Sequence, residues 1–353
     1  MRYRFEIFLL SGMAMMVACL PVRAMSPACH SPQRFARLGN FRLAHHRQIR
    51  DLRLGYRLCG KLNARKSNAV LFPAWFGGNS GQMLANVGPG RLLDSRKYFV
   101  ILVNPLGNGI STSPSNSRLQ PGMKFPRITI AGMVRSEHML LTRVLHLRHL
   151  HAAMGISMGG MQSFQWAVQY PRFMDEVIPI VGTPRPTVYD LLAFRAQRDM
   201  IRESKIWQNG HYRGNPVLAG LQEEGSLGLT TPQYRNEHSP RTQWPALLRR
   251  LDAPAQSPFD LNDFMRQSQA ISTLNVSVPY GGRMARAAAR VRARMLIVPS
   301  RQDHTVNPQP ALRFARLVQA RIFLLTSDCG HLASGCEAAR LNPVIHAFMA
   351  QTR

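Results

Sequence analysis

Short apolar runs recur along this chain, and between them apolar residues return every three or four positions. Six runs have the length and composition of buried strands: residues 68–73, 98–103, 150–154, 176–181, 294–299 and 321–325. Helical periodicity covers residues 133–145, 158–170 and 308–320. Strands that alternate with helices in this way predict an α/β fold, in which a mainly parallel sheet carries helices on both faces.

The interval between the strands at 176–181 and 294–299 is far longer than one connecting helix requires. Short helical pieces broken by proline and glycine fill it, which predicts a mostly helical lid at residues 184–289. The lid divides the core into two parts, residues 25–183 and 290–353. Its aromatic residues either line a substrate entrance or pack the lid, and they are Trp207, Tyr212, Tyr234, Trp244 and Tyr280.

The segment Gly155-Ile-Ser157-Met-Gly159 joins a predicted strand to a predicted helix. A serine in Gly-x-Ser-x-Gly at such a junction is typical of a nucleophile elbow, a sharp turn that projects the hydroxyl. The flanking glycines are needed because side chains there would collide with neighbouring backbone. We therefore expect Ser157 to be a catalytic nucleophile of the α/β-hydrolase type rather than part of an ordinary turn.

In that fold the acid and then the histidine follow the serine along the chain, each in a loop after a strand. Asp303 follows the run at 294–299, and His331 follows the run at 321–325. Asp328 is a rival acid, but it lies on the loop of the histidine itself, and His346 lies in a terminal helical segment. The sequence thus predicts Asp303 as the acid and His331 as the general base.

An acyl-transfer site also needs hydrogen-bond donors for the oxyanion. The fold supplies one from the amide after the nucleophile, here Met158, and one from the loop after an early strand. Trp75 is the expected second donor because it lies in the loop 74–78 that follows residues 68–73. The alternative is a tryptophan that only packs the pocket.

Several motifs together resemble the homoserine O-acetyltransferase family of the α/β-hydrolase superfamily. The similar segments are 74–77, 104–114, 125–130, 157–162 and, in the lid, 206–212. The resemblance implies an α/β-hydrolase fold and transfer of an acetyl group from acetyl-CoA, which would be a co-substrate rather than a bound cofactor.

The sequence departs from the family at three places, two of which concern the substrate. Leu332 stands after the histidine where the family has an aspartate that helps hold the amino-acid acceptor, and Pro73 replaces a histidine before the oxyanion loop. The arginine expected after the lid's Gly220-Leu221 pair is also not in register. A zwitterionic acceptor needs charged partners in a partly dry pocket. Homoserine specificity is therefore not expected to carry over.

The N-terminus has the pattern of a secretory signal peptide over residues 1–24: a basic start, an apolar stretch and a small-residue cleavage site after Ala24. A lipoprotein cleavage site before Cys19 is a weaker match, so we expect a periplasmic or secreted protein rather than a lipid-anchored one. The polar, basic segment 25–50 is expected at the periphery. Cleavage after Ala24 would leave four cysteines, which either pair in one of three ways or stay free: Cys29, Cys59, Cys329 and Cys336.

The formal net charge is +27, with 45 basic and 18 acidic residues. Nearly all the basic residues are scattered arginines, and no zinc-finger or RNA-binding pattern accompanies them. This distribution favours a solvated basic surface that touches anionic envelope surfaces, and it argues against a specific nucleic-acid partner. A homodimer is compatible with the sequence. No metal-binding spacing or nucleotide loop is present, so neither a metal nor a cofactor is expected.

These observations predict serine-dependent acyl transfer through an acyl-serine intermediate. Because CoA thioesters are cytosolic metabolites and the acceptor charges are missing, hydrolysis of a small ester by an exported enzyme is the favoured reaction. An acetyl-CoA-dependent O-acetyltransferase acting on homoserine or a related alcohol is the alternative. A non-catalytic envelope binding protein is the second alternative.

Overall fold

The structure is a computed structural model that describes residues 29–43, 46–214, 216–252 and 259–351. The predicted signal peptide, residues 1–24, lies outside the described residues. Within the described ranges, no helix combines the length and the apolar character needed to cross a bilayer.

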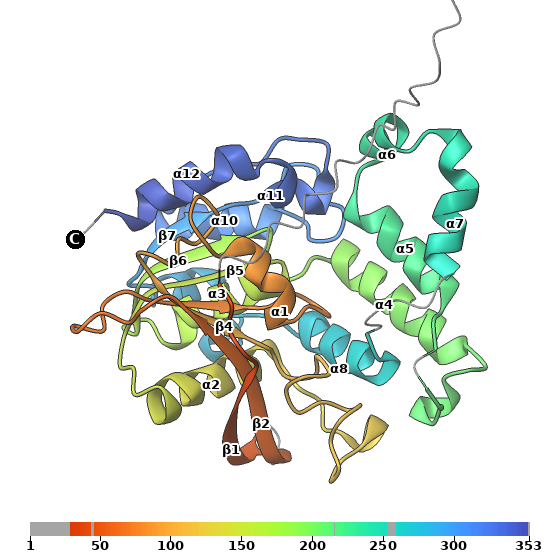
Figure 1. Ribbon diagram of the computed structural model, residues 1–353, viewed down its shortest axis with the longest axis horizontal. Helices are drawn as coiled ribbons and strands as arrows, with labels where there is room; N and C mark the ends of the chain where they lie inside the picture. Colours follow the sequence, from red (N-terminus) through yellow and green to blue (C-terminus); the bar gives the residue numbers. More distant parts are fainter. Residues whose placement is uncertain (1–28, 44–45, 215, 253–258, 352–353) are drawn as a thin grey trace, which may run out of the picture.

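Eight strands form one sheet in the order β1-β2-β4-β3-β5-β6-β7-β8 in the described chain (Figure 1). Their bounds are β1 Arg34–Arg42, β2 Gln48–Cys59, β3 Ala69–Pro73, β4 Phe99–Val103, β5 Leu150–Ile156, β6 Met174–Ile180, β7 Arg294–Ile297 and β8 Arg321–Ile322. The strands from β3 to β8 pair in parallel, whereas β1 pairs with β2 and β2 with β4 in antiparallel fashion. The predicted fold, a mainly parallel sheet of the α/β-hydrolase type, is confirmed.

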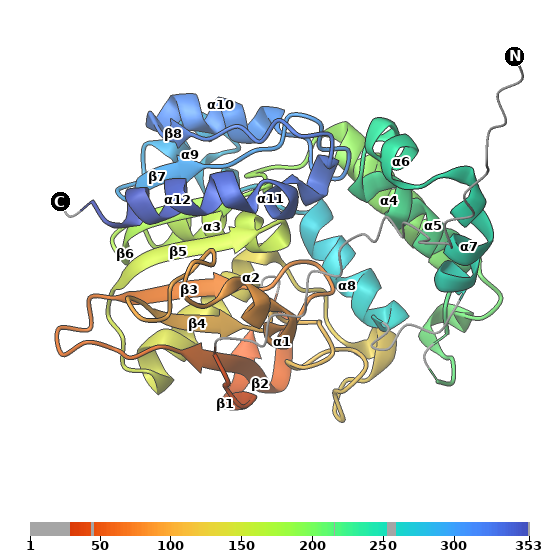
Figure 2. The ribbon, with the colours of Figure 1, turned by 45° about the horizontal axis from the view of Figure 1, so that its top comes forward.

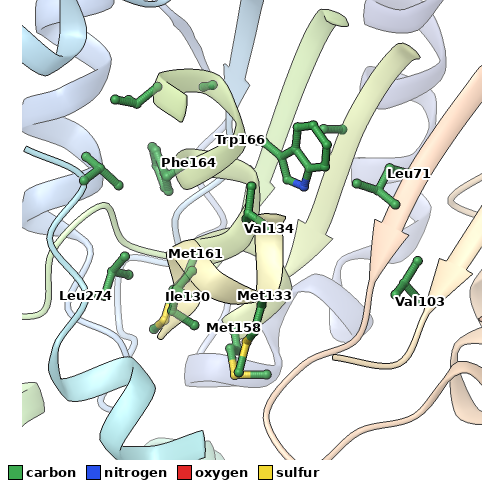
Figure 3. Close-up of a cluster of buried hydrophobic side chains, with 14 of the residues drawn as sticks. Leu71, Val103, Ile130, Met133, Val134, Met158, Met161, Phe164, Trp166 and Leu274 are labelled. Carbon is green, nitrogen blue, oxygen red and sulfur yellow. The ribbon is translucent and has the colours of Figure 1, made fainter. Parts of the chain in front are cut away.

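Alternate residues of the central strands enter two apolar clusters, one on each face of the sheet. Leu71 of β3 lies in the first cluster, and its neighbours Val70 and Phe72 lie in the second. Helices α2 (Ile130–Met139), α3 (Met158–Gln169), α9 (Met284–Ala288) and α10 (Gln309–Val318) supply the first cluster, part of which Figure 3 shows. Helices α1 (Ser80–Met83), α11 (Ala333–Cys336) and α12 (Ala338–Met349) supply the second. Burial on both faces explains why these strands read as continuous apolar runs.

The segment expected at the periphery forms part of the sheet. β1 and β2 make an antiparallel hairpin at its edge, and Phe41, Ile49 and Leu52 are fully or almost fully buried against the core. The alternation of these apolar residues with arginines marks a strand with one face in water. The apolar positions are interrupted by a turn and by register shifts, so the pattern is short and irregular along the sequence.

Two other elements differ from the prediction by three residues or more at one end. Helix α2 begins at Ile130, three residues before the predicted start, and ends in a π-helical turn over Leu140–Val144. The side chain of Thr129 caps it by accepting a hydrogen bond from the Gly132 amide. β8 keeps only two of the five predicted residues, although Leu325 forms a further bridge with Ser300.

The long interval after β6 forms a helical body beside the sheet (Figure 2). It contains α4 Val188–Glu203, α5 Ala219–Leu229, α6 Pro232–His238, α7 Trp244–Asp252 and α8 Leu261–Ser272. A small apolar cluster of its own includes Ile201, Trp207 and Phe264. Leu274, Val276 and helix α9 already pack in the core, so the chain returns to the core before residue 289.

Two disulfides close loops in the core, Cys29–Cys59 and Cys329–Cys336. They select one of the three pairings that the sequence left open. The first fixes the segment before β1 to the end of β2, and the second spans the loop that carries His331.

The carboxyl group of Glu137 is fully buried in the core cluster under α2. Its Oε2 accepts a hydrogen bond of 2.7 Å from Trp166 Nε1, and its Oε1 has no hydrogen-bond partner among the described residues. Burial raises the pKa of Glu137 to about 8. The folded protein therefore holds the proton that the unfolded chain releases near pH 4.5.

This raised pKa predicts stability that is present in full below about pH 4.5 and declines as the pH rises toward 8. The substitution Glu137→Gln keeps nearly the same side-chain shape but removes the titrating carboxyl group. The fall in unfolding free energy between pH 5 and pH 8 should therefore be smaller by an amount on the order of a few kcal/mol. Asp263 has a similarly raised pKa and will leave a residual slope. Urea unfolding at pH 5 and pH 8 measures the change, with the exposed Glu223→Gln as a control. An unaltered slope in Glu137→Gln would contradict the prediction.

Candidate active site

Ser157 lies in the tight turn between β5 and α3. Its backbone has φ 57° and ψ −120°, outside the regions that side-chain-bearing residues favour. The turn is held from below by a hydrogen bond of 2.9 Å from the Ser157 amide to the Ile180 carbonyl at the end of β6. The strand, the strained serine and the helix together form the predicted elbow, with the hydroxyl at the carboxyl edge of the sheet.

The glycines around this turn are required by close contacts between backbone segments. A Cβ on Gly155 would lie 2.2 Å from the carbonyl carbon of Gly159, and a Cβ on Gly159 would lie 2.4 Å from the Pro73 carbonyl oxygen. A Cβ on Gly160 would lie 2.8 Å from the Ile180 carbonyl oxygen. Real Cβ atoms do not approach backbone this closely, so these positions accept only glycine without a shift of β3, β5 or α3.

His331 and Asp303 reach the serine from the two predicted loops. His331 Nε2 lies 2.8 Å from Ser157 Oγ, and His331 Nδ1 lies 2.7 Å from Asp303 Oδ2. Because a carboxylate only accepts hydrogen bonds, Nδ1 carries the proton, and in the neutral ring Nε2 accepts from the serine hydroxyl. A serine, an imidazole and a buried carboxylate joined in this order are the groups that nucleophilic acyl transfer uses.

The surrounding loops hold the acid and the imidazole in place. The other carboxylate oxygen of Asp303 accepts hydrogen bonds of 2.9 and 2.8 Å from the amides of Thr305 and Val306. The Ser300 hydroxyl donates to the Gly330 carbonyl at 2.7 Å, which connects the loop of the acid to the loop of the histidine. The side chains of Asp303 and His331 are more than nine-tenths buried, so the geometry of this pair is fixed before any substrate binds.

The rival residues lie elsewhere. The backbone carbonyl of Asp328 accepts hydrogen bonds from Thr231, while His331 pairs with Asp303. His346 lies in α12, where its Nε2 donates to the Arg91 carbonyl at 2.7 Å.

The two expected oxyanion donors meet at the same edge. Met158 is the first residue of α3, where a helix leaves its amide without an intrahelical acceptor. Trp75 follows β3, and its amide donates no hydrogen bond to any part of the chain that the structure describes. The Trp75 indole folds over Gly78, where a Cβ would lie 2.4 Å from Nε1.

Four side chains, from α3, α8 and the loop after β4, hold the backbone of the loop from residue 74 to 80. Gln162 of α3 donates to the Ala74 carbonyl at 3.3 Å, and Asn108 donates to the Gly78 carbonyl at 3.0 Å. Asn104 accepts from the Ser80 amide at 2.8 Å. Gln267 of α8 accepts from the Gly77 amide and donates to the Leu106 carbonyl, each at 3.0 Å. Sequence reasoning missed Gln267, because nothing along the chain connects a helix of the lid to a loop 190 residues earlier.

Ser157 and His331 open into a cavity of about 1350 Å³ between the sheet edge and the helical body. Most of its lining is apolar: Trp75, Phe76, Met161, Phe194, Leu218, Leu221, Leu229, Phe259, Leu261, Phe264, Ile271, Leu332 and Leu341. None of the five lid aromatics singled out in the sequence lines it. Trp207 and Tyr212 instead pack within the lid, where they donate hydrogen bonds to Asn262 and Asp260.

Few charged groups reach the cavity. Glu224 lies in its wall and accepts a hydrogen bond of 2.5 Å from Gln197, and burial raises its pKa. Apart from Glu224, Arg91 is the one Asp, Glu, Lys or Arg residue among the described residues that line the cavity. Leu332, the residue after His331, contributes an apolar side chain beside the imidazole. No cluster of three or more metal-ligating side chains occurs among the residues that the structure describes.

Comparison with known proteins gives one consistent result. Residues 70–335 match the family model described as the alpha/beta hydrolase fold. The chain is 30% identical over 335 residues to an ethyl acetate hydrolase of Pseudomonas veronii, covering 91% of this chain and 95% of that one. It is 28% identical to a homoserine O-acetyltransferase of Geotalea uraniireducens, covering 88% and 94%. The solved structure of the acetyl esterase MekB superposes with a TM-score of 0.83 at 28% identity, covering 91% and 96%.

The backbone contacts of the elbow predict the effect of Gly159→Ala. The added methyl group would collide with the Pro73 carbonyl, so the variant should lose about 2 kcal/mol or more of unfolding free energy. Gly225→Ala in the middle of α5 is the matched control, since a Cβ there meets nothing within 4 Å. It should gain about 0.5–1 kcal/mol. Chemical denaturation of both variants checks the pair, and equal stability would contradict the packing account.

Proposed function

Because the chain belongs to the α/β-hydrolase family and is homologous to ester hydrolases and homoserine O-acetyltransferases, we propose that it is a serine hydrolase that cleaves small esters. The observation that carries this proposal is the continuous hydrogen-bonded chain Asp303–His331–Ser157, which opens into an apolar cavity. Enzymatic acyl transfer is what the family and these relatives support in general. The triad roles, the substrate and the compartment are specific to the proposal.

In the proposed reaction Ser157 Oγ attacks the ester carbonyl carbon while His331 Nε2 takes the hydroxyl proton. Asp303 stabilises the imidazolium through the 2.7 Å contact to Nδ1. The tetrahedral intermediate then expels the alcohol, which leaves with that proton, and an acyl-serine remains. Water then attacks the acyl carbon while His331 Nε2 takes one of its protons. When the bond between that carbon and Ser157 Oγ breaks, His331 returns the proton to Oγ, so the carboxylic acid leaves and the serine hydroxyl is restored.

The amides of Met158 and Trp75 are the proposed oxyanion donors. Both belong to backbone that is fixed in advance, by the helix start in one case and by the hydrogen bonds to residues 74–80 in the other. Donors that need no rearrangement stabilise the developing negative charge more strongly than water does.

The lining of the cavity favours water over an amino-acid acceptor. A zwitterion needs charged partners in a partly dry site. Arg91 and Glu224 line the cavity, but the Glu224 carboxyl accepts a hydrogen bond from Gln197 and has a raised pKa, and the residue after His331 is the apolar Leu332. The relative from Pseudomonas veronii is described as an ethyl acetate hydrolase, which is in keeping with an ester whose two sides are apolar.

Transfer of an acetyl group from acetyl-CoA to homoserine or a related alcohol is the second candidate. It is favoured by the volume of about 1350 Å³, which exceeds the usual range of a small-molecule pocket and leaves room for an extended co-substrate. The proposed hydrolysis uses only side chains and backbone amides of this chain and requires no cofactor.

We further propose that the protein works outside the cytoplasm. The two disulfides support this proposal, because disulfides form and persist mainly in oxidising compartments. The proposed partner is a small ester, and the excess of arginine would bring the protein close to anionic envelope surfaces.

Ser157→Ala tests the nucleophile. Cleavage of 4-nitrophenyl acetate should fall by at least about 10³-fold, because removing the nucleophile leaves only binding and oxyanion stabilisation. Ser239→Ala, in the turn after α6, is the control and should keep wild-type turnover. The same proteins are assayed with acetyl-CoA, with and without homoserine. Thiol release that depends on homoserine would show that the protein is a transferase rather than a hydrolase. Wild-type ester turnover by Ser157→Ala would contradict the proposed mechanism.

Gln267→Leu tests the support of the oxyanion loop. The Gly77 amide would lose its acceptor, so the loop should shift. We expect kcat to fall about 10–100-fold, less than the roughly 10²–10³-fold cost of removing an oxyanion donor outright, with KM nearly constant. Gln269→Leu on the same helix does not touch the loop and should leave kcat within about twofold. Thermal melting distinguishes a local effect from unfolding. A change in KM alone would assign Gln267 to substrate binding instead.

A further inference from the structure

A second cavity, of about 380 Å³, lies on the outside of the core. It shares no lining residue with the cavity of about 1350 Å³ at Ser157 and His331, which we call the reaction cavity. The lining residues of the second cavity come from the start of β2, the segment before α2 and helix α8. Its lining residues are Arg47, Gln48, Arg50, Gln120, Met123, Lys124, Phe125, Pro126, Arg127 and Arg266.

The lining of this cavity is far more cationic than the chain as a whole. Five of its ten residues are arginine or lysine and none is acidic. In the whole sequence only 45 of 353 residues are basic, or about one in eight. A general excess of arginine therefore does not account for the cluster, and the cavity has a positive field that no lining carboxylate offsets.

Arg266 supplies the buried base of the cavity, since only 6% of this residue is exposed. Its guanidinium donates to the carbonyls of Phe125 and Met123 at 2.8 and 2.7 Å and to Gln269 Oε1 at 2.9 Å. These bonds occupy three of the five N–H groups of an arginine, and among the described residues no carboxylate pairs with it. A buried cation without a counterion is costly, so an anion that entered this cavity would relieve the cost.

Electrostatic repulsion acts in the same direction. The pKa of Arg266 is lowered to about 10, first by burial and then by the charges of Arg127 and Arg47. The guanidinium remains protonated at neutral pH and faces other cations rather than a neutralising group.

The walls of the cavity are built in advance by side-chain hydrogen bonds. The Gln120 amide accepts from the Arg50 backbone amide at 2.8 Å and donates to the Gln48 carbonyl at 3.1 Å. It thereby joins the loop to β2, while Arg266 joins the same loop to α8. The three elements that carry the cations are held together without any ligand.

We propose that this cavity is a binding site for the phosphate group of a small anionic ligand, with Arg47, Arg127 and Arg266 as its main donors. Guanidinium groups match the geometry of phosphate oxygens in paired hydrogen bonds. The volume is at the lower end for small-molecule sites, and it fits a phosphate with a short substituent. A soluble phosphate ester and the headgroup of an anionic phospholipid both present this chemistry.

The test compares two variants that lose the same charge. Arg47→Gln with Arg127→Gln removes two exposed cations from the cavity and leaves Arg266, which holds the loop, in place. Arg286→Gln with Arg290→Gln removes two exposed arginines near α9, which lie outside the cavity. Binding of inorganic pyrophosphate is measured by calorimetry, and binding to vesicles of phosphatidylglycerol or of phosphatidylcholine by sedimentation. Thermal melting confirms that each variant is folded.

We expect wild-type protein and the Arg286/Arg290 variant to bind equally, and the Arg47/Arg127 variant to bind at least tenfold more weakly. If the loss appears with pyrophosphate, the site accepts free phosphate. If it appears only with phosphatidylglycerol vesicles, the site accepts a lipid headgroup. Equal weakening in both variants, or the absence of any saturable binding by wild-type protein to either probe, would overturn the proposal. Neither readout uses ester cleavage, so the result is independent of the proposed function.

Discussion

The close approach of backbone segments around residue 157 is the constraint on which the active site depends. Gly155 and Gly159 lie where a Cβ would meet backbone atoms at 2.2 and 2.4 Å, and Gly182 packs against Gly160 in the same way. Only this approach allows α3 to begin directly at the ends of β3 and β5. The strained serine, the first amide of α3 and the loop after β3 therefore share one edge of the sheet, where Asp303 and His331 arrive from the loops after β7 and β8. The core packing on both faces of the sheet offsets the cost of the unfavourable backbone conformation at Ser157.

Helix α8 joins the helical body to the core through polar as well as apolar contacts, since Ala270 and Ile271 pack in the core cluster. Asp263 accepts hydrogen bonds from the amide and hydroxyl of Ser115, Gln267 spans two loops of the core, and Arg266 holds a third segment. Buried polar groups are costly when unpaired, so each of these contacts fixes one position of the helix. The same helix lines the reaction cavity through Phe264 and the cationic cavity through Arg266.

The features that could be predicted from the sequence are those formed by residues close together in the chain. The central strands are buried on both faces and read as apolar runs, and the elbow is encoded by glycines spaced around one serine. The hairpin of β1 and β2 was missed, because its apolar residues alternate with arginines and its register is interrupted. The lid aromatics illustrate a different limit, since composition identified them, but Trp207 packs inside the lid and Phe76, Phe259 and Phe264 face the cavity instead.

The sequence by itself determined the fold class, the elbow and the order of serine, acid and histidine, because these are local patterns or follow from the order of the strands. Only the tertiary structure decided that Asp303 rather than Asp328 faces His331, that the cysteines pair as 29–59 and 329–336, and that Gln267 supports a loop 190 residues away. It also gathered five cations from three separate segments around one cavity. Each of these depends on side chains that meet across elements distant in the chain, and the position of such elements is set by the packing of the whole core.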